Sequence, residues 1–416
     1  MNAAQSQSNI SSRAATTVPV VVHVLHDGGV GNISAAQIQD GLDVLNTDYN
    51  RLNADTADTR NTVEAPFKPN AGMMDIEFKL ARIDPQGNCT NGIVRVDAPD
   101  QTFNAGDDCK YTSNGGDDAW PTDSYFNIWI VNTVEGSGGG FIVLGYAQFP
   151  YFGAAETYGL VMRNDQFGTI ESATGSDGGT LTHEVGHCLG LLHIFQGPFT
   201  GGDGCHTEDC TSNGDYVCDT PPQQVESYSC SQTLNSCAEV PVGDVYGFDA
   251  YDQIENYMSY NSCQNMFSQN QVDIMNTNFV DVAFLANLIS PANIIASGVN
   301  DPDQLCQAEF GTTQTTVCSG TTLDFSDFSY QGPTSWVWSV SGIEGVDYNY
   351  TGGTDANSQN PSVQFINGGT YDISLTASDG ILSDTEIKTG FINVLPVSNT
   401  ISFIEKFEGI TDFNLT

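Results

Sequence analysis

The stretch His183-Glu184-Val185-Gly186-His187-Cys188-Leu189-Gly190-Leu191-Leu192-His193 decides the fold of this 416-residue chain. On a helix with 3.6 residues per turn, His183 and His187 lie one turn apart on the same face. The opposite face carries the apolar residues Leu181, Val185, Cys188 and Leu192. Such a helix can bury one side and bind a metal with the other. Glycine accepts the left-handed conformation, so Gly190 can end the helix and allow His193 to return as a third ligand.

Three neutral imidazoles suit Zn²⁺ and leave its fourth position open to water. Glu184 adjoins the ligands without being needed as one, so it is the predicted general base. It would take a proton from the zinc-bound water and later pass it to a leaving amine. The alternative is a set of ordinary polar residues on an exposed helix face. The chain has only 6 histidines and half of them occupy these positions, which favours the metal site.

The extension of the motif by Gly190 and His193 resembles the signature of the metzincin zinc peptidases. In that family, a tight turn with a methionine lies beneath the metal, and Asn256-Tyr257-Met258-Ser259-Tyr260 fits this turn. Within the metzincins, the chain is most similar to the pappalysins, peptidase family M43, over residues 17–288. The matching segments are 18–24, 34–49, 183–197, 219–221 and 256–260, with Cys263 and Phe267 beyond them.

The resemblance implies an α+β metzincin-type catalytic domain, with a mixed twisted sheet, an active-site helix and two lobes. It also implies a zinc metalloendopeptidase with Met258 as a structural residue below the metal. In the family, the tyrosine after this turn helps to hold the oxyanion, a role that falls to Tyr260 here. Family members that cleave before arginine or lysine place a carboxylate beyond the turn. Residues 261–263 offer none, so we do not expect basic specificity.

The charge balance excludes two classes of partner. Eleven Lys and Arg residues stand against 51 Asp and Glu residues, which gives a formal net charge of −40. Such acidity repels nucleic acids and anionic membrane surfaces. No apolar run is long enough to span a bilayer, so membrane insertion is not expected either.

The 11 cysteines lack the paired CxxC spacing of a structural zinc site, so we expect disulfides and a secreted protein. The protein is also expected to be a monomer. Cys188 is the expected unpaired thiol, and Cys237 with Cys263 and Cys306 with Cys318 are candidate pairs. Residues 1–15 lack a signal-peptide pattern. We therefore expect the signal and any pro-segment to lie outside this sequence.

The segment 201–219 is dense in Asp, Glu, Gly and Cys, and it follows the third histidine. Calcium takes several oxygens from one flexible loop. The side chains of Asp215, Asp219 and Thr220, with the carbonyl of Val217, are the predicted Ca²⁺ cage. A solvated acidic loop without an ion is the open alternative.

Five segments are expected along the chain: an N-terminal tail (1–16), the catalytic domain (17–290), a linker (291–304), a β-sandwich (305–396) and the start of a further segment (397–416). Ser268 is predicted to cap the helix that closes the catalytic domain. The alternating strands expected at 321–328, 335–340 and 369–379 resemble an all-β, immunoglobulin-like PKD domain.

Within the catalytic domain, we predict strands over 18–25, 75–81 and 126–131 and a helix over 35–49. Residues 159–163 are predicted to form the edge strand above the cleft. Free backbone groups of an edge strand can pair with an extended peptide, so a protein or peptide substrate is expected.

Two classes of function compete. One is a secreted zinc endopeptidase with an accessory sandwich, and the other is a cell-surface adhesion or binding protein with an inactive protease-like fold. Glu184 discriminates between them, because a binding protein has no use for the base. An enzyme for small amides or esters is disfavoured, since such substrates need neither an edge strand nor an accessory domain.

Overall fold

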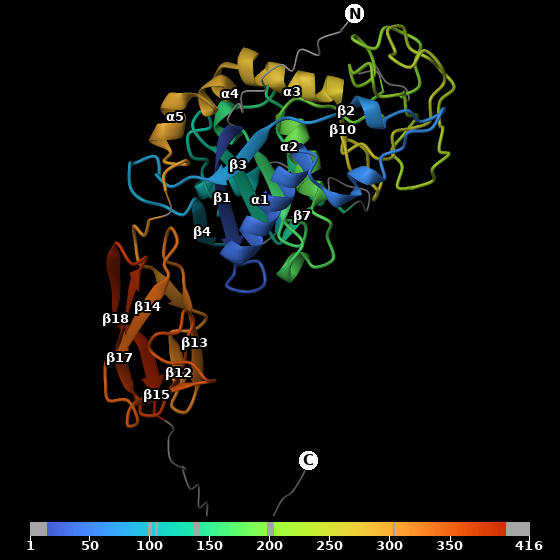
Figure 1. Cartoon of the computed structure of the whole chain (residues 1–416). Helices are drawn as coiled ribbons and strands as arrows, with labels where there is room; N and C mark the ends of the chain where they lie inside the picture. The colour runs from blue at the N-terminus through green and yellow to red at the C-terminus, as the bar shows by residue number, and fades with distance from the viewer. Residues whose placement is uncertain are drawn as a thin grey trace, which may run out of the picture. The chain divides into compact units, whose positions relative to one another are not determined.

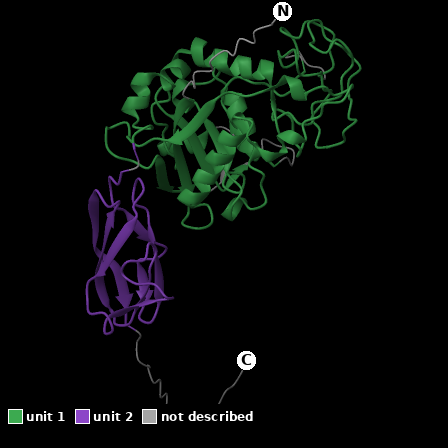
Figure 2. Ribbon diagram, viewed as in Figure 1, with its two compact units in different colours: residues 1–301 green, residues 302–416 purple. Residues whose placement is uncertain are grey.

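The computed structural model describes residues 15–98, 102–104, 107–135, 142–197, 204–302 and 304–396. The chain divides into two compact units, residues 1–301 and residues 302–416 (Figure 2). The segment 397–416 lies outside the described residues, as does the predicted tail up to residue 14.

A six-stranded mixed sheet forms the centre of the first unit. Strand β1 (Thr16–His26) pairs in parallel with β3 (Ile76–Leu80), β4 (Ile93–Asp97) and β6 (Phe126–Val131). Residues 17–25 of β1 are all buried, as expected for a parallel strand covered on both faces. Strand β9 (Leu160–Arg163) continues the parallel order next to β6, and β8 (Gly145–Ala147) is antiparallel to β9.

The predicted position of the edge strand was therefore wrong. Strand β9 lies inside the sheet between β6 and β8, and the three-residue strand β8 forms the edge. A three-residue strand is too short to show the alternation by which strands are recognised in a sequence. Its place is decided by pairing with β9 and by contact with the active-site helix α2 (Gly179–Cys188).

Helices α1 (Ala35–Tyr49) and α2 lie against the sheet (Figure 1). Helix α1 begins at Ser34, whose Oγ accepts a hydrogen bond from the backbone N–H of Gln37. The side chains that share the main core with β1 are Ile38, Leu42, Leu45 and Tyr49 from α1 and Leu181, Val185 and Cys188 from α2. The apolar side of α2 is thus buried, which leaves its histidine side for the cleft.

Three further helices close the first unit: α3 (Gln269–Asp281), α4 (Ala283–Leu288) and α5 (Pro291–Ala296). Ser268 and Gln271 form a reciprocal capping box at the start of α3, as expected of the predicted cap. The predicted linker was wrong over residues 291–296. Asn293 in α5 donates from Nδ2 to the carbonyl of Ser124, and the carbonyl of Ser297 accepts from two backbone N–H groups of the segment after β3. Tertiary hydrogen bonds, not periodicity, hold this short helix.

The remaining regular structure of the first unit is short. Strand β2 (Ala71–Gly72) pairs with β10 (Phe267–Ser268), and β5 (Thr102–Asn104) pairs with β7 (Thr133–Glu135). The 3₁₀ helices are Ala54–Ala57, Lys68–Asn70, Asp108–Lys110, Thr112–Asn114, Ala155–Thr157 and Glu171–Ala173.

Residues 204–266 form turns and isolated bridges that disulfides cross-link. The bonds Cys205–Cys237, Cys210–Cys218 and Cys230–Cys263 all lie in this region. Cys188 carries a free thiol, as predicted. The suggested pairs Cys237–Cys263 and Cys306–Cys318 were wrong, since the first two cysteines bond elsewhere and Cys318 is an exposed free thiol. Sequence spacing does not encode which cysteines the fold brings together.

The second unit consists of two four-stranded sheets. The first contains β11 (Phe310–Thr312), β13 (Thr322–Asp327), β16 (Ser362–Phe365) and β15 (Tyr348–Thr351). The second contains β12 (Thr316–Cys318), β18 (Ser383–Leu395), β17 (Gly369–Ser378) and β14 (Ser335–Val340). Side chains from both sheets, among them Phe325, Phe365, Trp338 and Leu375, share one core. This shared core makes the unit a β-sandwich.

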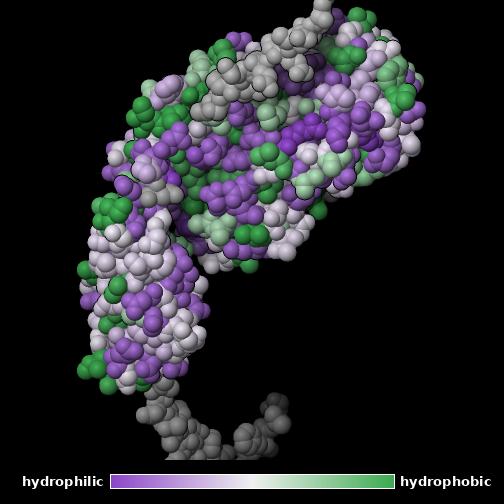
Figure 3. All heavy atoms as spheres, viewed as in Figure 1, coloured by the Kyte–Doolittle hydropathy of each residue, from purple (hydrophilic) through white to green (hydrophobic). Residues whose placement is uncertain are grey.

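The face shown in Figure 3 is mostly hydrophilic, with apolar residues scattered over it. Among the described residues, no helix has the length and apolar character that crossing a membrane requires.

Candidate metal centre and active site

Helix α2 and the turn after it bring three imidazoles together. The helix ends at Cys188, and Gly190 follows with a φ of 99° in the left-handed region. A Cβ at Gly190 would stand 2.2 Å from Nδ2 of Asn278, so both the backbone angle and the space require glycine here. The chain reverses at this point and carries His193 back toward the helix.

The Nε2 atoms of His183, His187 and His193 lie 3.1 Å from one another in all three pairs. In His183 and His187, the other ring nitrogen lies within hydrogen-bond distance of a backbone carbonyl. Nδ1 of His183 lies 2.6 Å from the carbonyl of Tyr257, and Nδ1 of His187 lies 2.7 Å from that of Leu191. Because a carbonyl only accepts, each Nδ1 carries the proton and each Nε2 presents a lone pair.

Electrostatics keep these imidazoles neutral. Burial lowers the pKa of His183 to about 3 and that of His187 to about 4. Burial and the two neighbouring imidazoles lower the pKa of His193 to about 2. Three nitrogens bound at 2.0–2.1 Å to one tetrahedral ion lie roughly 3.3 Å apart, close to the observed spacing. The donor set therefore fits Zn²⁺.

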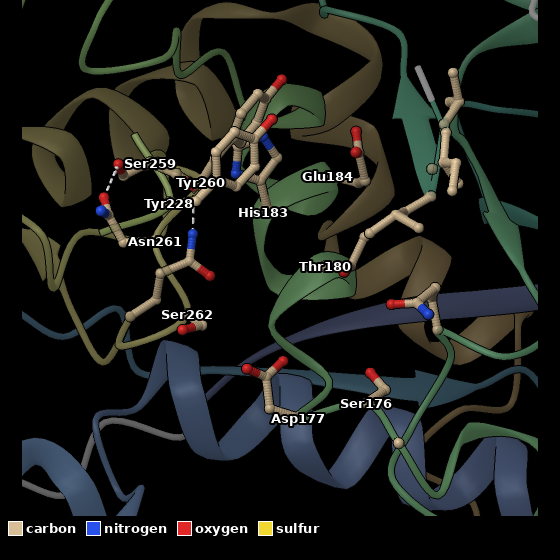
Figure 4. Close-up of a pocket in the computed structure, with 17 residues that line it drawn as sticks. Ser176, Asp177, Thr180, His183, Glu184, Tyr228, Ser259, Tyr260, Asn261 and Ser262 are labelled. Atoms are coloured by element: carbon tan, nitrogen blue, oxygen red, sulfur yellow. Dashed lines mark hydrogen bonds between the residues drawn. The ribbon is translucent and has the colours of Figure 1, made fainter. Parts of the chain in front are cut away.

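Glu184 points into the cavity beside His183 (Figure 4). Its side chain is buried, and burial raises its pKa to about 8. A carboxylate of this basicity is matched to proton transfer near neutral pH. Gly145 of the edge strand β8 lies next to Glu184 and lines the same cavity.

The turn at Asn256–Tyr260 supports the helix from below. Met258 is fully buried, and its N–H donates to Oδ1 of Asn256. A Cβ at Gly186 would stand only 2.6 Å from Sδ of Met258, so the glycine in the middle of α2 makes room for the methionine. The sequence motif indicated the methionine but gave no reason for Gly186.

Tyr260 extends toward the imidazoles from the same turn. Its hydroxyl lies 3.2 Å from Nε2 of His193, and its ring centroid lies 5.5 Å from that of His183. Burial, with the negative charge of Glu184 next in importance, raises the pKa of Tyr260 to about 12. The hydroxyl therefore keeps its proton at neutral pH and can donate a hydrogen bond.

Three of the four predicted calcium ligands lie together. Oδ2 of Asp215 accepts from Oγ1 of Thr220 at 2.7 Å, and this hydroxyl also lies 3.1 Å from the carbonyl of Val217. Asp215 is buried, and burial raises its pKa to about 8. The carboxylate of Asp219 is engaged elsewhere, since it accepts from Oγ of Ser268 and from the N–H of Asn270 at the start of α3.

A cavity of about 580 Å³ runs beside the histidines. Its lining comprises residues 142–145, Gln166, 175–177, Thr180, His183, Glu184, Tyr228, 259–262 and Gln264. Asp177 and Tyr228 were not predicted. No carboxylate comes from residues 261–263, as expected, but Asp177 supplies one from the residues just before α2 (Figure 4). No sequence motif marks either residue, because each reaches the cavity from a segment without regular structure.

The model of peptidase family M43, described as pregnancy-associated plasma protein-A, matches residues 110–281. Mature mirolysin of Tannerella forsythia, solved with a cleaved peptide, is 35% identical, with a TM-score of 0.56 over 70% of this chain and all of that one. The chain belongs to the pappalysin family. It is a zinc metalloendopeptidase with a metzincin-type α+β fold.

Relatives with curated names agree with this membership. An extracellular metalloprotease of Arthroderma otae is 27% identical over 264 residues, which cover 62% of this chain and 76% of the relative. Extracellular metalloprotease 1 of Coccidioides posadasii is 38% identical over 153 residues, or 35% of this chain and 46% of the relative.

Proposed function

We propose that the protein is a secreted endopeptidase that cleaves extended segments of proteins, with Glu184 as general base. The observation that carries the proposal is the position of Glu184, buried in the cavity next to His183 and against the edge strand β8. An inactive adhesion protein would have no use for a carboxylate held in this place. Names of relatives as extracellular enzymes and several disulfides support secretion.

His183, His187 and His193 are the proposed zinc ligands. When bound, the zinc supplies Lewis acidity, which acidifies water and polarises a peptide carbonyl. Glu184 takes the proton from the attacking water while the water oxygen forms a bond to the carbonyl carbon. When the carbon–nitrogen bond breaks, Glu184 returns that proton to the nitrogen of the leaving amine.

Tyr260 is the proposed oxyanion residue. The carbonyl oxygen gains negative charge as the water oxygen adds, and a hydrogen-bond donor placed there lowers the barrier. The hydroxyl of Tyr260 stays protonated at neutral pH and lies beside His193, so it can donate to that oxygen.

Strand β8 is the proposed substrate-aligning element. Its residues pair with β9 along one side, and Gly145 brings the strand against Glu184. An extended peptide that pairs with the other side of β8 would lie with its backbone across the catalytic groups. This requirement for extended backbone favours unfolded segments or loops as substrates.

The remaining proposals concern the surroundings of the site. A Ca²⁺ ion bound by Asp215, Thr220 and the carbonyl of Val217 would offset the buried charge of Asp215, with Asp219 as a further candidate. The sandwich unit is the proposed PKD-like accessory domain, and the protein is proposed to act as a monomer. With a net charge of −40, we propose no nucleic-acid partner and no membrane insertion.

Replacement of Glu184 by Gln tests the central proposal. The three histidines stay in place, so the zinc content should equal that of the unchanged protein. Peptide hydrolysis should fall by roughly a hundredfold to ten-thousandfold or more, because only the base is lost. Turnover close to that of the unchanged protein, in a Glu184→Gln protein with full zinc, would refute the role of Glu184.

A further inference from the structure

Tyr228 lines the active-site cavity without belonging to any element of the catalytic motif. Its side chain is 70% exposed, so it is not held there as part of a core. Its ring stacks on that of Tyr260, with 6.0 Å between centroids and 28° between planes. An exposed aromatic ring that faces a substrate cavity is available for contact with a ligand.

The segment that carries Tyr228 is cross-linked to the residues that follow the turn at Asn256–Tyr260. The disulfide Cys230–Cys263 joins the two segments. Nδ2 of Asn261, a residue only 1% exposed, donates to the carbonyl of Ser229 at 2.5 Å. A covalent bond and a buried amide therefore fix a segment that has no regular structure of its own.

The two tyrosines form one side of the cavity. Figure 4 shows Tyr228 and Tyr260 beside His183, with Glu184 and Thr180 on the other side and Asp177 at the bottom of the view. The ring of Tyr228 and Thr180 in the first turn of α2 both line this cavity, so a substrate side chain that fills it would contact both.

We propose that Tyr228 is a specificity-determining residue, whose ring limits the size of the substrate side chain that enters the cavity next to the scissile bond. This ring forms a wall of the cavity, and the disulfide Cys230–Cys263 holds the wall in place. This inference rests on the proposed peptide hydrolysis and adds a contact that sets substrate choice. Tyr228 has no part in the proton transfers.

A change in the size of this wall, which is the side chain at residue 228, should change the preferred size of the substrate side chain in a defined direction. With Tyr228→Ala, the cavity widens. The kcat/KM for peptides with a tryptophan at the residue whose side chain enters the cavity, divided by the kcat/KM for peptides with an alanine there, should rise roughly tenfold. With Tyr228→Trp, the cavity narrows and the same ratio should fall. Tyr228→Phe keeps the ring and should keep the ratio.

The experiment is a cleavage profile of a peptide library, read by mass spectrometry, with kcat and KM for matched peptides. Because Tyr228 is exposed, its truncation leaves no buried void, and an unchanged melting temperature checks folding. Phe248→Ala is the matched control, because Phe248 is a partly exposed aromatic residue of the same disulfide-rich region that does not line this cavity. Its profile should equal that of the unchanged protein.

Two results would overturn the proposal. One is an identical profile for the Ala, Trp and Phe variants. The other is an equal fall of kcat for all peptides with KM and profile unchanged, since this would mean that Tyr228 acts only through Tyr260. Failure of the unchanged, zinc-loaded protein to cleave any peptide would instead refute the proposed function itself.

The role of the disulfide Cys230–Cys263 has its own test. Joint replacement of Cys230 and Cys263 by Ser should shift the profile in the same direction as Tyr228→Ala, because the wall loses its anchor. Joint replacement of Cys210 and Cys218 removes a disulfide that does not line the cavity, and it should leave the profile unchanged. An unchanged profile without Cys230–Cys263 would overturn the role given to this bond.

Discussion

Gly145 of the edge strand lies directly against Glu184, since a Cβ atom at this glycine would stand 3.2 Å from Cγ of the glutamate. The same Cβ would stand 3.0 Å from the carbonyl oxygen of Val161 and 2.7 Å from Sδ of Met162. The strand proposed to align the substrate and the proposed base thus lie in close contact. The absence of a side chain at residue 145 makes that contact possible.

Gly145→Ala should therefore displace either Glu184 or the edge strand. We expect kcat for a short peptide to fall roughly tenfold to a hundredfold, because a displacement of about 1 Å at a catalytic group costs this much. The zinc content should not change. Gly175→Ala is the control, because a Cβ there would meet no atom within 4 Å. An unchanged kcat for Gly145→Ala would show that the close approach has no catalytic role.

Asp48 of α1 gives stability a dependence on pH. Its Oδ2 accepts from Oγ1 of Thr182 in the active-site helix, and burial raises its pKa from 3.8 to about 6. The folded state therefore favours the protonated carboxyl. The contribution of protonated Asp48 to the free energy of unfolding is fully present below pH 3.8 and is lost as the pH rises through about 6.

Asp48→Asn removes this titration and keeps an oxygen that can accept from Thr182. From about pH 4 to about pH 7, the unchanged protein should lose on the order of 3 kcal/mol of unfolding free energy relative to the variant. Chemical denaturation of both zinc-loaded proteins over this range measures the difference. A constant difference would contradict the raised pKa of Asp48.

The parts of the fold that could be predicted have strong local signals. The apolar run of β1, the 3.6-residue periodicity of α1 and the cap at Ser268 each depend on a short segment of chain. The histidine motif likewise needs one helix and one glycine. Local physical chemistry determines these features, so the sequence alone predicted them.

The features that were missed depend on contacts between distant segments. The short strand β8 takes its place at the edge of the sheet only through its pairing with β9. Helix α5 is held by hydrogen bonds to the segment after β3 and to Ser124. The segment that carries Tyr228 is held beside the cavity by the disulfide Cys230–Cys263. No periodicity or spacing within the sequence carries this information.

Selective removal of calcium should destabilise the disulfide-rich loop. Asp215 is buried with a pKa raised to about 8, so an ion that neutralises it would stabilise the folded state. A chelator too weak to remove zinc should lower the melting temperature and the activity together. Asp215→Asn should reduce the effect of the chelator. An unchanged melting temperature at constant zinc content, with no calcium in elemental analysis, would contradict the site.

Truncation after the first unit tests whether that unit alone carries out catalysis while the sandwich has an accessory role. A chain that ends at residue 301 keeps α5, and all residues proposed for chemistry lie between His183 and Tyr260. It should cleave a short unstructured peptide at the rate of the full chain. A chain that ends at residue 290 loses the hydrogen bond from Asn293 to Ser124 and the acceptor at Ser297, so it should melt at a lower temperature.

The choice of substrate distinguishes two roles of the sandwich. If this unit tethers the enzyme to a large or insoluble protein, the chain that ends at residue 301 should lose activity on that protein and keep its rate on the short peptide. The loss would come from a lower effective concentration, since no catalytic contact changes. Rates on both substrates, measured for both chain lengths, decide the matter. An equal loss on both substrates would mean that the sandwich supports the catalytic cleft itself, which contradicts the proposed accessory role.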